Sequence, residues 1–190
     1  MIFSQIPSCL LAQQTAASDQ VHASTDRNAQ PQRPGAYYRS PEGWQQMEQI
    51  LSFSRAHPLI LAPMVVRPRA LRFRGAEATL KITNPRPVFL LKSVPLPGGG
   101  SARDVVLAKL DARKDYRDLP VMPGRTVFHS RDALPASHIV EVTVNAESPD
   151  VFSITPTKDL RPGEYILTFG MGEVGGYDFE VLPPSMAAKR

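Results

Sequence analysis

The chain of 190 residues is 42% hydrophobic and 21% charged, an ordinary globular composition that fits one domain with tails. Its 19 prolines argue against long helices and favour short strands joined by turns. A single cysteine, Cys9, excludes an intrachain disulfide and a metal site built on cysteines. Because no run of 18 apolar residues occurs, we expect no transmembrane span.

The net charge of +4 is unevenly placed along the chain. Residues 35–140 carry 16 Lys or Arg against 8 Asp or Glu, whereas residues 141–182 carry 2 against 8. The two segments either interleave as neighbouring strands, in which opposite charges commonly pair, or stay apart and make the molecule electrically polar. Interleaving is the simpler alternative.

The N-terminal part of the chain precedes the predicted folded body. Residues 1–12 end in an apolar Leu-Leu-Ala sequence that is typical of the end of a truncated signal peptide, which predicts an exported protein beginning near Gln13. Residues 13–34 hold only Val21 as a large apolar side chain, so they cannot bury enough surface to offset the entropy of ordering. We expect a disordered, flexible linker over 13–34, one domain over 35–184 and a tail over 185–190.

The body is a succession of short strands separated by turns. Strands are expected at residues 36–39, 44–47, 70–73, 78–83, 88–92, 105–110, 125–130, 138–146, 151–155, 164–169 and 177–182, and residues 58–66 are an apolar run broken by Pro63. Hairpins are expected across residues 40–43, 74–76, 147–150 and 170–176, and a loop or helical turn at 111–118. The pattern predicts an all-β, antiparallel sandwich of the immunoglobulin-like kind.

Alternation along several strands indicates which residues face the core. Side chains of Ala78, Leu80 and Ile82 alternate with polar residues. The same pattern predicts inward positions for Val140, Val142, Val144, Tyr165, Leu167, Phe169, Tyr177, Phe179 and Val181.

A cluster of arginines is the first candidate for a ligand or partner surface. Arg67, Arg69, Arg72 and Arg74 lie within eight residues, and Arg72 and Arg74 share one strand face. Such a face can meet phosphate, lipid headgroups or an acidic polymer. The alternative is a solvated face that pairs with acids of the C-terminal strands. No aromatic residues interleave with the arginines, so we expect no nucleic-acid partner.

Aromatic residues of the first hairpin are the second candidate. Tyr37, Tyr38 and Trp44 gather there, and consecutive strand residues point to opposite faces, so we expect one tyrosine to be exposed. An exposed aromatic platform can stack on sugar rings, whereas the alternative is a contribution to the core.

Catalytic and cofactor signals are weak throughout the chain. Residues 170–175 match a dinucleotide-binding glycine pattern, but a strand-like sequence follows instead of the helix that a pyrophosphate needs, so we interpret them as a hairpin loop. The four histidines lack zinc-site spacing, and no Gly-x-Ser-x-Gly sequence occurs. We therefore expect no cofactor, no metal and no enzymatic activity.

Four stretches carry a resemblance to a known group. They are residues 37–39 with Gly43 and Trp44, residues 73–78, residues 84–89 and residues 154–165. The chain resembles exported bacterial proteins with immunoglobulin-like β-sandwiches, to which no activity is assigned. The resemblance implies export and the fold, and it implies nothing about catalysis.

Together these observations predict a non-enzymatic exported protein of the periplasm, cell surface or extracellular space. We expect it to act through protein–protein contacts, self-assembly included, with residues 13–34 able to pair with the strand edge of a neighbour. The alternative is a module that binds a carbohydrate or another polymer through the tyrosines, Trp44 or the arginines.

Overall fold

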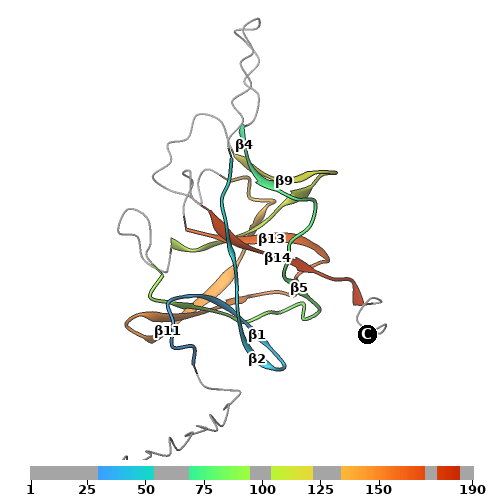
Figure 1. Ribbon diagram of the computed structural model, residues 1–190. Coiled ribbons are helices and arrows are strands. Elements are labelled where there is room, and N and C mark those ends of the chain that lie inside the picture. Colours follow the sequence, from blue (N-terminus) through green and yellow to red (C-terminus); the bar gives the residue numbers. More distant parts are fainter. Residues whose placement is uncertain (1–29, 54–68, 95–103, 122–133, 170–174, 185–190) are drawn as a thin grey trace, which may run out of the picture.

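The computed structural model describes residues 30–53, 69–94, 104–121, 134–169 and 175–184. The regular elements within these ranges are all β-strands (Figure 1). The apolar run at 58–66 and the strand expected at 125–130 lie outside the described residues. So do residues 1–12, most of the expected linker and the expected tail.

The strands form three sheets. The five-stranded sheet has the order β11-β12-β6-β1-β2 and is antiparallel throughout. Its members are β1 (Gly35–Ser40), β2 (Gly43–Gln46), β6 (Phe89–Lys92), β11 (Val142–Ser148) and β12 (Val151–Pro156). The hairpins β1–β2 and β11–β12 confirm two of the predicted turns.

The central sheet has the order β10-β7-β13-β14-β3, and β5 adds a short parallel pairing to β14. Its members are β3 (Gln49–Ile50), β5 (Lys81–Ile82), β7 (Val106–Lys109), β10 (Ile139–Val140), β13 (Gly163–Thr168) and β14 (Gly176–Val181). The β13–β14 hairpin confirms the prediction for the C-terminal strands.

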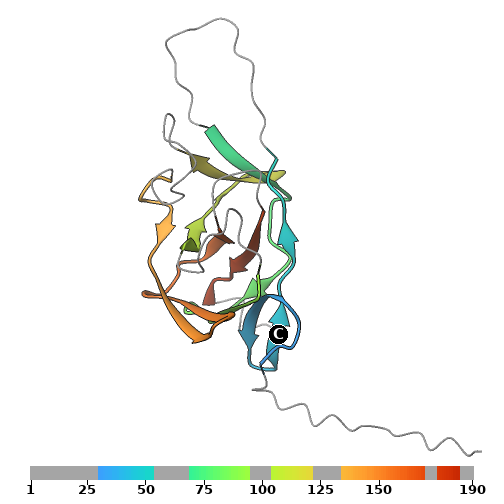
Figure 2. The ribbon, with the colours of Figure 1, turned by 90° about the vertical axis from the view of Figure 1, so that its left-hand side faces the viewer.

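A third, small sheet has the order β4-β9-β8, with β4 (Arg69–Arg74), β8 (Asp111–Ala112) and β9 (Tyr116–Val121). Figures 1 and 2 show the small sheet above the central sheet and the five-stranded sheet below it. The fold is thus the predicted all-β sandwich of antiparallel sheets. The small sheet covers the face of the central sheet that points away from the five-stranded sheet.

Alternate residues of the central sheet supply two cores. Leu107, Tyr165 and Phe179 pack into the larger core, which lies between the central and five-stranded sheets. Their neighbours Ala108 and Ile166 pack into a second core with Phe73 and Leu119 of the small sheet. A strand buried on both faces needs a nearly continuous apolar sequence, which residues 105–110 provide.

The predicted inward faces are confirmed. Ala78, Ile82, Tyr165, Leu167, Phe169, Tyr177, Phe179 and Val181 are buried, and Leu80, Val140, Val142 and Val144 pack against the larger core. The expected strand 138–146 is divided at Glu141, because β10 belongs to the central sheet and β11 to the five-stranded sheet.

Two expectations for local structure are wrong. Residues 70–73 and 78–83 do not form a hairpin, because β4 pairs with β9 and β5 pairs with β14 of another sheet. Gly75, whose φ is +86°, turns the chain away from the small sheet. Residues 111–118 are neither a loop nor a helical turn, since they form β8, a turn and the start of β9.

Two features fix the ends of strands. The Tyr165 hydroxyl donates to the Arg161 carbonyl at 2.7 Å, a contact of the kind that closes the corners of Greek-key sandwiches. Gly176 pairs with Ile50 of β3, and a Cβ at Gly175 would lie 1.9 Å from the Ile50 carbonyl oxygen. Close approach of two backbones therefore explains why these positions are glycine.

Candidate interaction site

The outer face of the small sheet, which points away from the second core, carries the two described arginine side chains of the predicted cluster. The guanidinium of Arg72 donates from Nε to Asp118 at 2.9 Å and lies 3.7 Å from the ring centre of Tyr116. This hydrogen bond favours the charged form and raises the pKa of Arg72. Arg72 thus pairs with an acid of β9 and not with the expected acids of the C-terminal strands. The backbone of Arg69 begins β4 opposite Val121, and Arg67 lies outside the described residues.

Arg74 is the exposed member of this face. Its guanidinium lies over the ring of Phe53 at 5.7 Å, and the backbone bridge between Phe53 and Arg72 holds that ring in place. Arg113 and Lys114 are exposed in the adjoining turn between β8 and β9. We call Arg72, Arg74, Arg113 and Lys114 the cationic face. Within the described part of the chain, only Arg72 of these four makes an ion pair.

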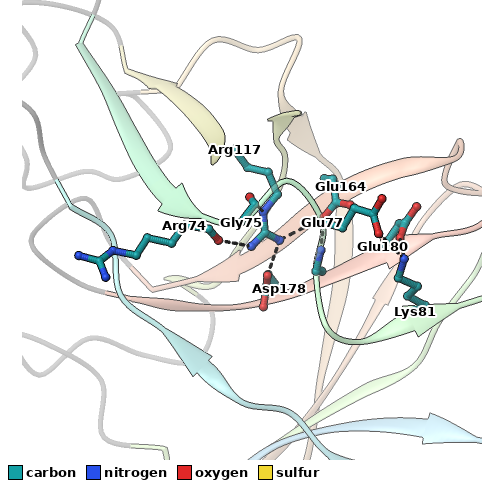
Figure 3. Close-up of polar contacts among 9 residues, drawn as sticks. Arg74, Gly75, Glu77, Lys81, Arg117, Glu164, Asp178 and Glu180 are labelled. Atoms are coloured by element: carbon teal, nitrogen blue, oxygen red, sulfur yellow. Dashed lines mark hydrogen bonds and ion pairs between the residues drawn. The ribbon is translucent and has the colours of Figure 1, made fainter. Parts of the chain in front are cut away.

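Beneath this face lies a buried network centred on Arg117 of β9. Its guanidinium donates to Glu164 of β13 at 3.1 Å and also to Asp178 of β14 (Figure 3). All three side chains are at most 7% exposed. Buried charges are stable only when they are paired and hydrogen-bonded, and here the network ties the small sheet to the central sheet.

The same arginine also holds the end of β4. Its Nη2 donates to the Arg74 carbonyl at 3.0 Å and its Nε donates to the Gly75 carbonyl at 3.1 Å. Glu164 in turn accepts the amide hydrogen of Ala78 at 3.0 Å. Figure 3 shows the Arg74 side chain pointing away from this network, so the network fixes the backbone from which the exposed guanidinium projects.

Burial dominates the electrostatics of Glu164. It raises the pKa of this carboxyl above the ordinary value of 4.5, although the charge and hydrogen bond of Arg117 act in the opposite direction. Sequence reasoning missed the network because Arg117 lay in an expected loop. The signal that the sequence offered was the presence of two acids, Glu164 and Asp178, within largely apolar C-terminal strands. Two acids in such strands need a cation as their partner.

The aromatic platform expected on the first hairpin is absent from the described surface. Tyr37 and Tyr38 are each 6% exposed, so the expectation that one is exposed is wrong. Tyr38 packs into the larger core, whereas Tyr37 packs with Leu90 and Val151 on the opposite sheet face. The Tyr37 hydroxyl donates to the Arg33 carbonyl at 2.9 Å. Trp44, half-buried, packs against that cluster and lies 5.5 Å from the Arg39 guanidinium.

A groove of about 560 Å³ runs along the junction of the small and central sheets, lined by Glu77, Lys109, Asp111, Arg113 and Glu180 among others. Two of these carboxylates are paired with Lys81, whose Nζ lies 2.5 Å from Glu77 and 3.1 Å from Glu180. No cluster of three or more metal-ligating side chains occurs among the described residues. Those residues also contain no helix that is long and apolar enough to span a membrane.

A second polar cluster contains Ser137, His138 and Asp111. The Ser137 hydroxyl lies 3.1 Å from Nδ1 of His138, and Nε2 lies 3.3 Å from the Asp111 carboxylate. Ser137 is exposed and adjacent to His138 in sequence. The contact with Asp111 holds the residue before β10 against β8, and the Lys109 amide of β7 donates to the His138 carbonyl at 2.7 Å.

The β11–β12 hairpin is the second surface of note. Its strand β11 is an outermost strand of seven residues that pairs with β12, and Glu147 and Asp150 are exposed at its turn. We call these two carboxylates the acidic tip.

Comparisons of the chain with protein-family models, curated proteins and solved structures find no match.

Proposed function

We propose that the protein is a non-enzymatic exported protein of the cell envelope or extracellular space that works through protein–protein contacts, self-assembly among them. The observation that carries the proposal is the open edge of β11. An outermost strand presents unpaired amide and carbonyl groups, and these groups are a template for a strand from another chain.

The hydrogen bonds of β11 show which groups are open. The Thr157 amide donates to the Glu141 carbonyl at 3.0 Å, so these two residues form a hydrogen-bonded pair at the start of the hairpin. Such pairs alternate along antiparallel strands. The backbone groups of Thr143 and Asn145 therefore face β12, whereas those of Val142, Val144 and Ala146 face outward. Val142 lies opposite Pro156, which has no amide hydrogen to offer.

Other sheet edges among the described residues are better protected. β3, β8 and β10 have two residues each and β2 has four, and short edge strands resist pairing. β4 has six residues, but the bridge from Phe53 to Arg72 occupies its outer side. β11, by contrast, has seven residues at the edge of its sheet, and its pairing with β12 is regular from Val142 to Ala146, before the bulge between Ala146 and Ser148.

Residues 13–34 of a second copy are the donor that the sequence favours. Within one copy the segment ends beside β11, because the Gln30 side chain donates to the Glu147 carboxylate of the same chain at 2.9 Å. A strand contact depends on backbone hydrogen bonds and packing, so it should survive high salt.

Light scattering of the full chain tests the proposal. Ala146→Pro removes one outward amide without touching the pairing with β12, and Ala146→Ser keeps that amide as the matched control. At 1 M salt, where contacts between charges are screened, we expect association of the full chain and of the serine variant, and monomers for the proline variant and for a shortened protein beginning at Gly35. A monomeric full chain at high concentration, in both low and high salt, would overturn the proposal.

Export has its own test. N-terminal sequencing of the protein from its natural host should find a start near Gln13, and retention of Met1 would contradict the export proposal.

The second candidate function is binding of an acidic polymer, which the exposed guanidinium of Arg74 favours. Burial of Tyr37 and Tyr38 removes the support for stacking on sugar rings.

A further inference from the structure

Two surfaces of opposite charge lie at opposite ends of the molecule. The cationic face belongs to the small sheet, and the acidic tip belongs to the five-stranded sheet on the other side of the central sheet (Figures 1 and 2). The uneven charge along the sequence therefore persists in space at these two places, although opposite charges also interleave elsewhere, as between Lys81 and Glu180.

The acidic tip keeps its negative charge. Asp150 accepts hydrogen bonds from the Ser93 hydroxyl at 2.7 Å and the Ser148 hydroxyl at 2.9 Å, and these bonds lower its pKa. Glu147 accepts from the neutral amide of Gln30. Lys92 is the nearby cation and adds only the weakest of the contributions to the pKa of Asp150. Neutral donors orient both carboxylates without cancelling their charge.

The cationic face is prepared for carboxylates. Stacking of Arg74 on Phe53 restricts the side chain, and the network of Arg117 fixes its backbone. A guanidinium held in this way loses less entropy when its planar set of donors meets a carboxylate. The turn between β8 and β9 adjoins the end of β4, because the Gly75 amide donates to the Asp115 carbonyl at 3.2 Å. This turn adds two exposed positive charges, Arg113 and Lys114, and one exposed carboxylate, Asp115.

We propose that the cationic face of one copy binds the acidic tip of a second copy. The inference rests on the proposed function, because it names a further contact in the same self-association. A two-fold contact of either surface with itself would place like charges together, whereas head-to-tail contact pairs opposite charges. Because the two surfaces lie at opposite ends, two copies cannot make both contacts with each other, so the contact propagates from copy to copy into a ring or a filament. It also leaves the outward backbone groups of Val142 and Val144 free for strand pairing.

Charge reversal in the full chain tests the contact at 0.1 M and 1 M salt, where the screening length is about 10 Å and about 3 Å. We expect Arg74→Glu and Glu147→Lys each to weaken self-association at 0.1 M salt at least tenfold. An equal mixture of the two variants, and a chain with both substitutions, should regain association because the opposite charges meet again. Lys158→Glu reverses an exposed charge outside both surfaces and is the control.

The outcomes separate this contact from the proposed function. If Arg74→Glu associates as the unchanged chain does while Ala146→Pro is monomeric, the head-to-tail contact is overturned and strand pairing stands. If reversal abolishes association and the mixture fails to restore it, the pairing of these two surfaces is wrong. If the unchanged chain stays monomeric yet binds polygalacturonate, and Arg74→Glu abolishes that binding, the cationic face serves a polymer and the self-contact is overturned.

Discussion

The two faces of the small sheet carry the same residue type in opposite settings. On the inner face Arg117 is 2% exposed among Phe73 and Leu119, and it meets two carboxylates and two backbone carbonyls. On the outer face Arg72 meets one carboxylate and a tyrosine ring, and Arg74 projects into solvent. Position on the sheet, and not residue type, decides whether an arginine is buried in a network of charges or lies at the surface.

The physical difference is the cost of desolvation. A buried ion must have every strong partner in place, and removal of one member leaves an uncompensated charge in the interior. An ion pair near solvent gains little, because water and salt screen it and water replaces a lost partner.

Removal of Arg117 should have the largest effect. Arg117→Met leaves Glu164 and Asp178 buried without their cation, so we expect a loss of about 3–5 kcal/mol in the free energy of unfolding. Urea denaturation measures this loss. Arg86→Met is the control, since its pair with Asp159 is exposed on both sides, and an equal loss in the two variants would show that the network is not a structural hub.

The same contrast of inner and outer faces exists on β11. Val142 packs against the larger core, whereas Thr143 is exposed. Val142→Asp should cost about 2–3 kcal/mol, because an unpaired carboxylate is pressed against apolar side chains. Thr143→Asp should change stability by about 0.5 kcal/mol. Equal losses in denaturant melts would mean that the faces of β11 are assigned wrongly.

The dependence of stability on pH should identify the inner network. Burial raises the pKa of Glu164, so the folded state keeps this proton at a pH at which the unfolded chain has released it. The contribution of Glu164 to the free energy of unfolding is therefore fully present below about pH 4.5. It is lost as the pH rises through the pKa that Glu164 has in the folded protein.

Glu164→Gln isolates this effect because the amide does not titrate. The free energy of unfolding of the unchanged protein, relative to that of the variant, should fall as the pH rises above 4.5. A difference that rises with pH would mean that Arg117 outweighs burial at Glu164.

Arg72→Gln should have a small effect on stability. The Arg72–Asp118 pair lies near solvent and, with Tyr116, belongs to the outer face. We expect a small decrease in the urea midpoint that shrinks further in 1 M salt. A loss comparable to that of Arg117→Met would remove the distinction between the two faces.

The sequence predicted what local patterns determine. Strands that are neighbours in the chain, such as β13 and β14, form hairpins, and alternation identified their core faces. The sequence could not show that β4 pairs with β9. Alternation indicates which residues of a strand face inward, but it does not indicate which distant strand pairs with that strand. Without that pairing the third sheet stayed hidden, and Arg117 could not be placed beside Glu164 and Asp178. Of the candidate residues, Arg72 and Arg74 share a face as predicted, whereas the tyrosines serve the interior.

One substitution made at two positions tests the contrast most directly. Lysine keeps the positive charge of arginine but lacks the planar set of donors that lets Arg117 reach both carboxylates and both carbonyls at once. We predict that Arg117→Lys lowers the free energy of unfolding by more than about 2 kcal/mol, while Arg74→Lys changes it by about 0.5 kcal/mol or less. Equal losses at the two positions would contradict the distinction between a structural inner arginine and an outer arginine that the fold does not need.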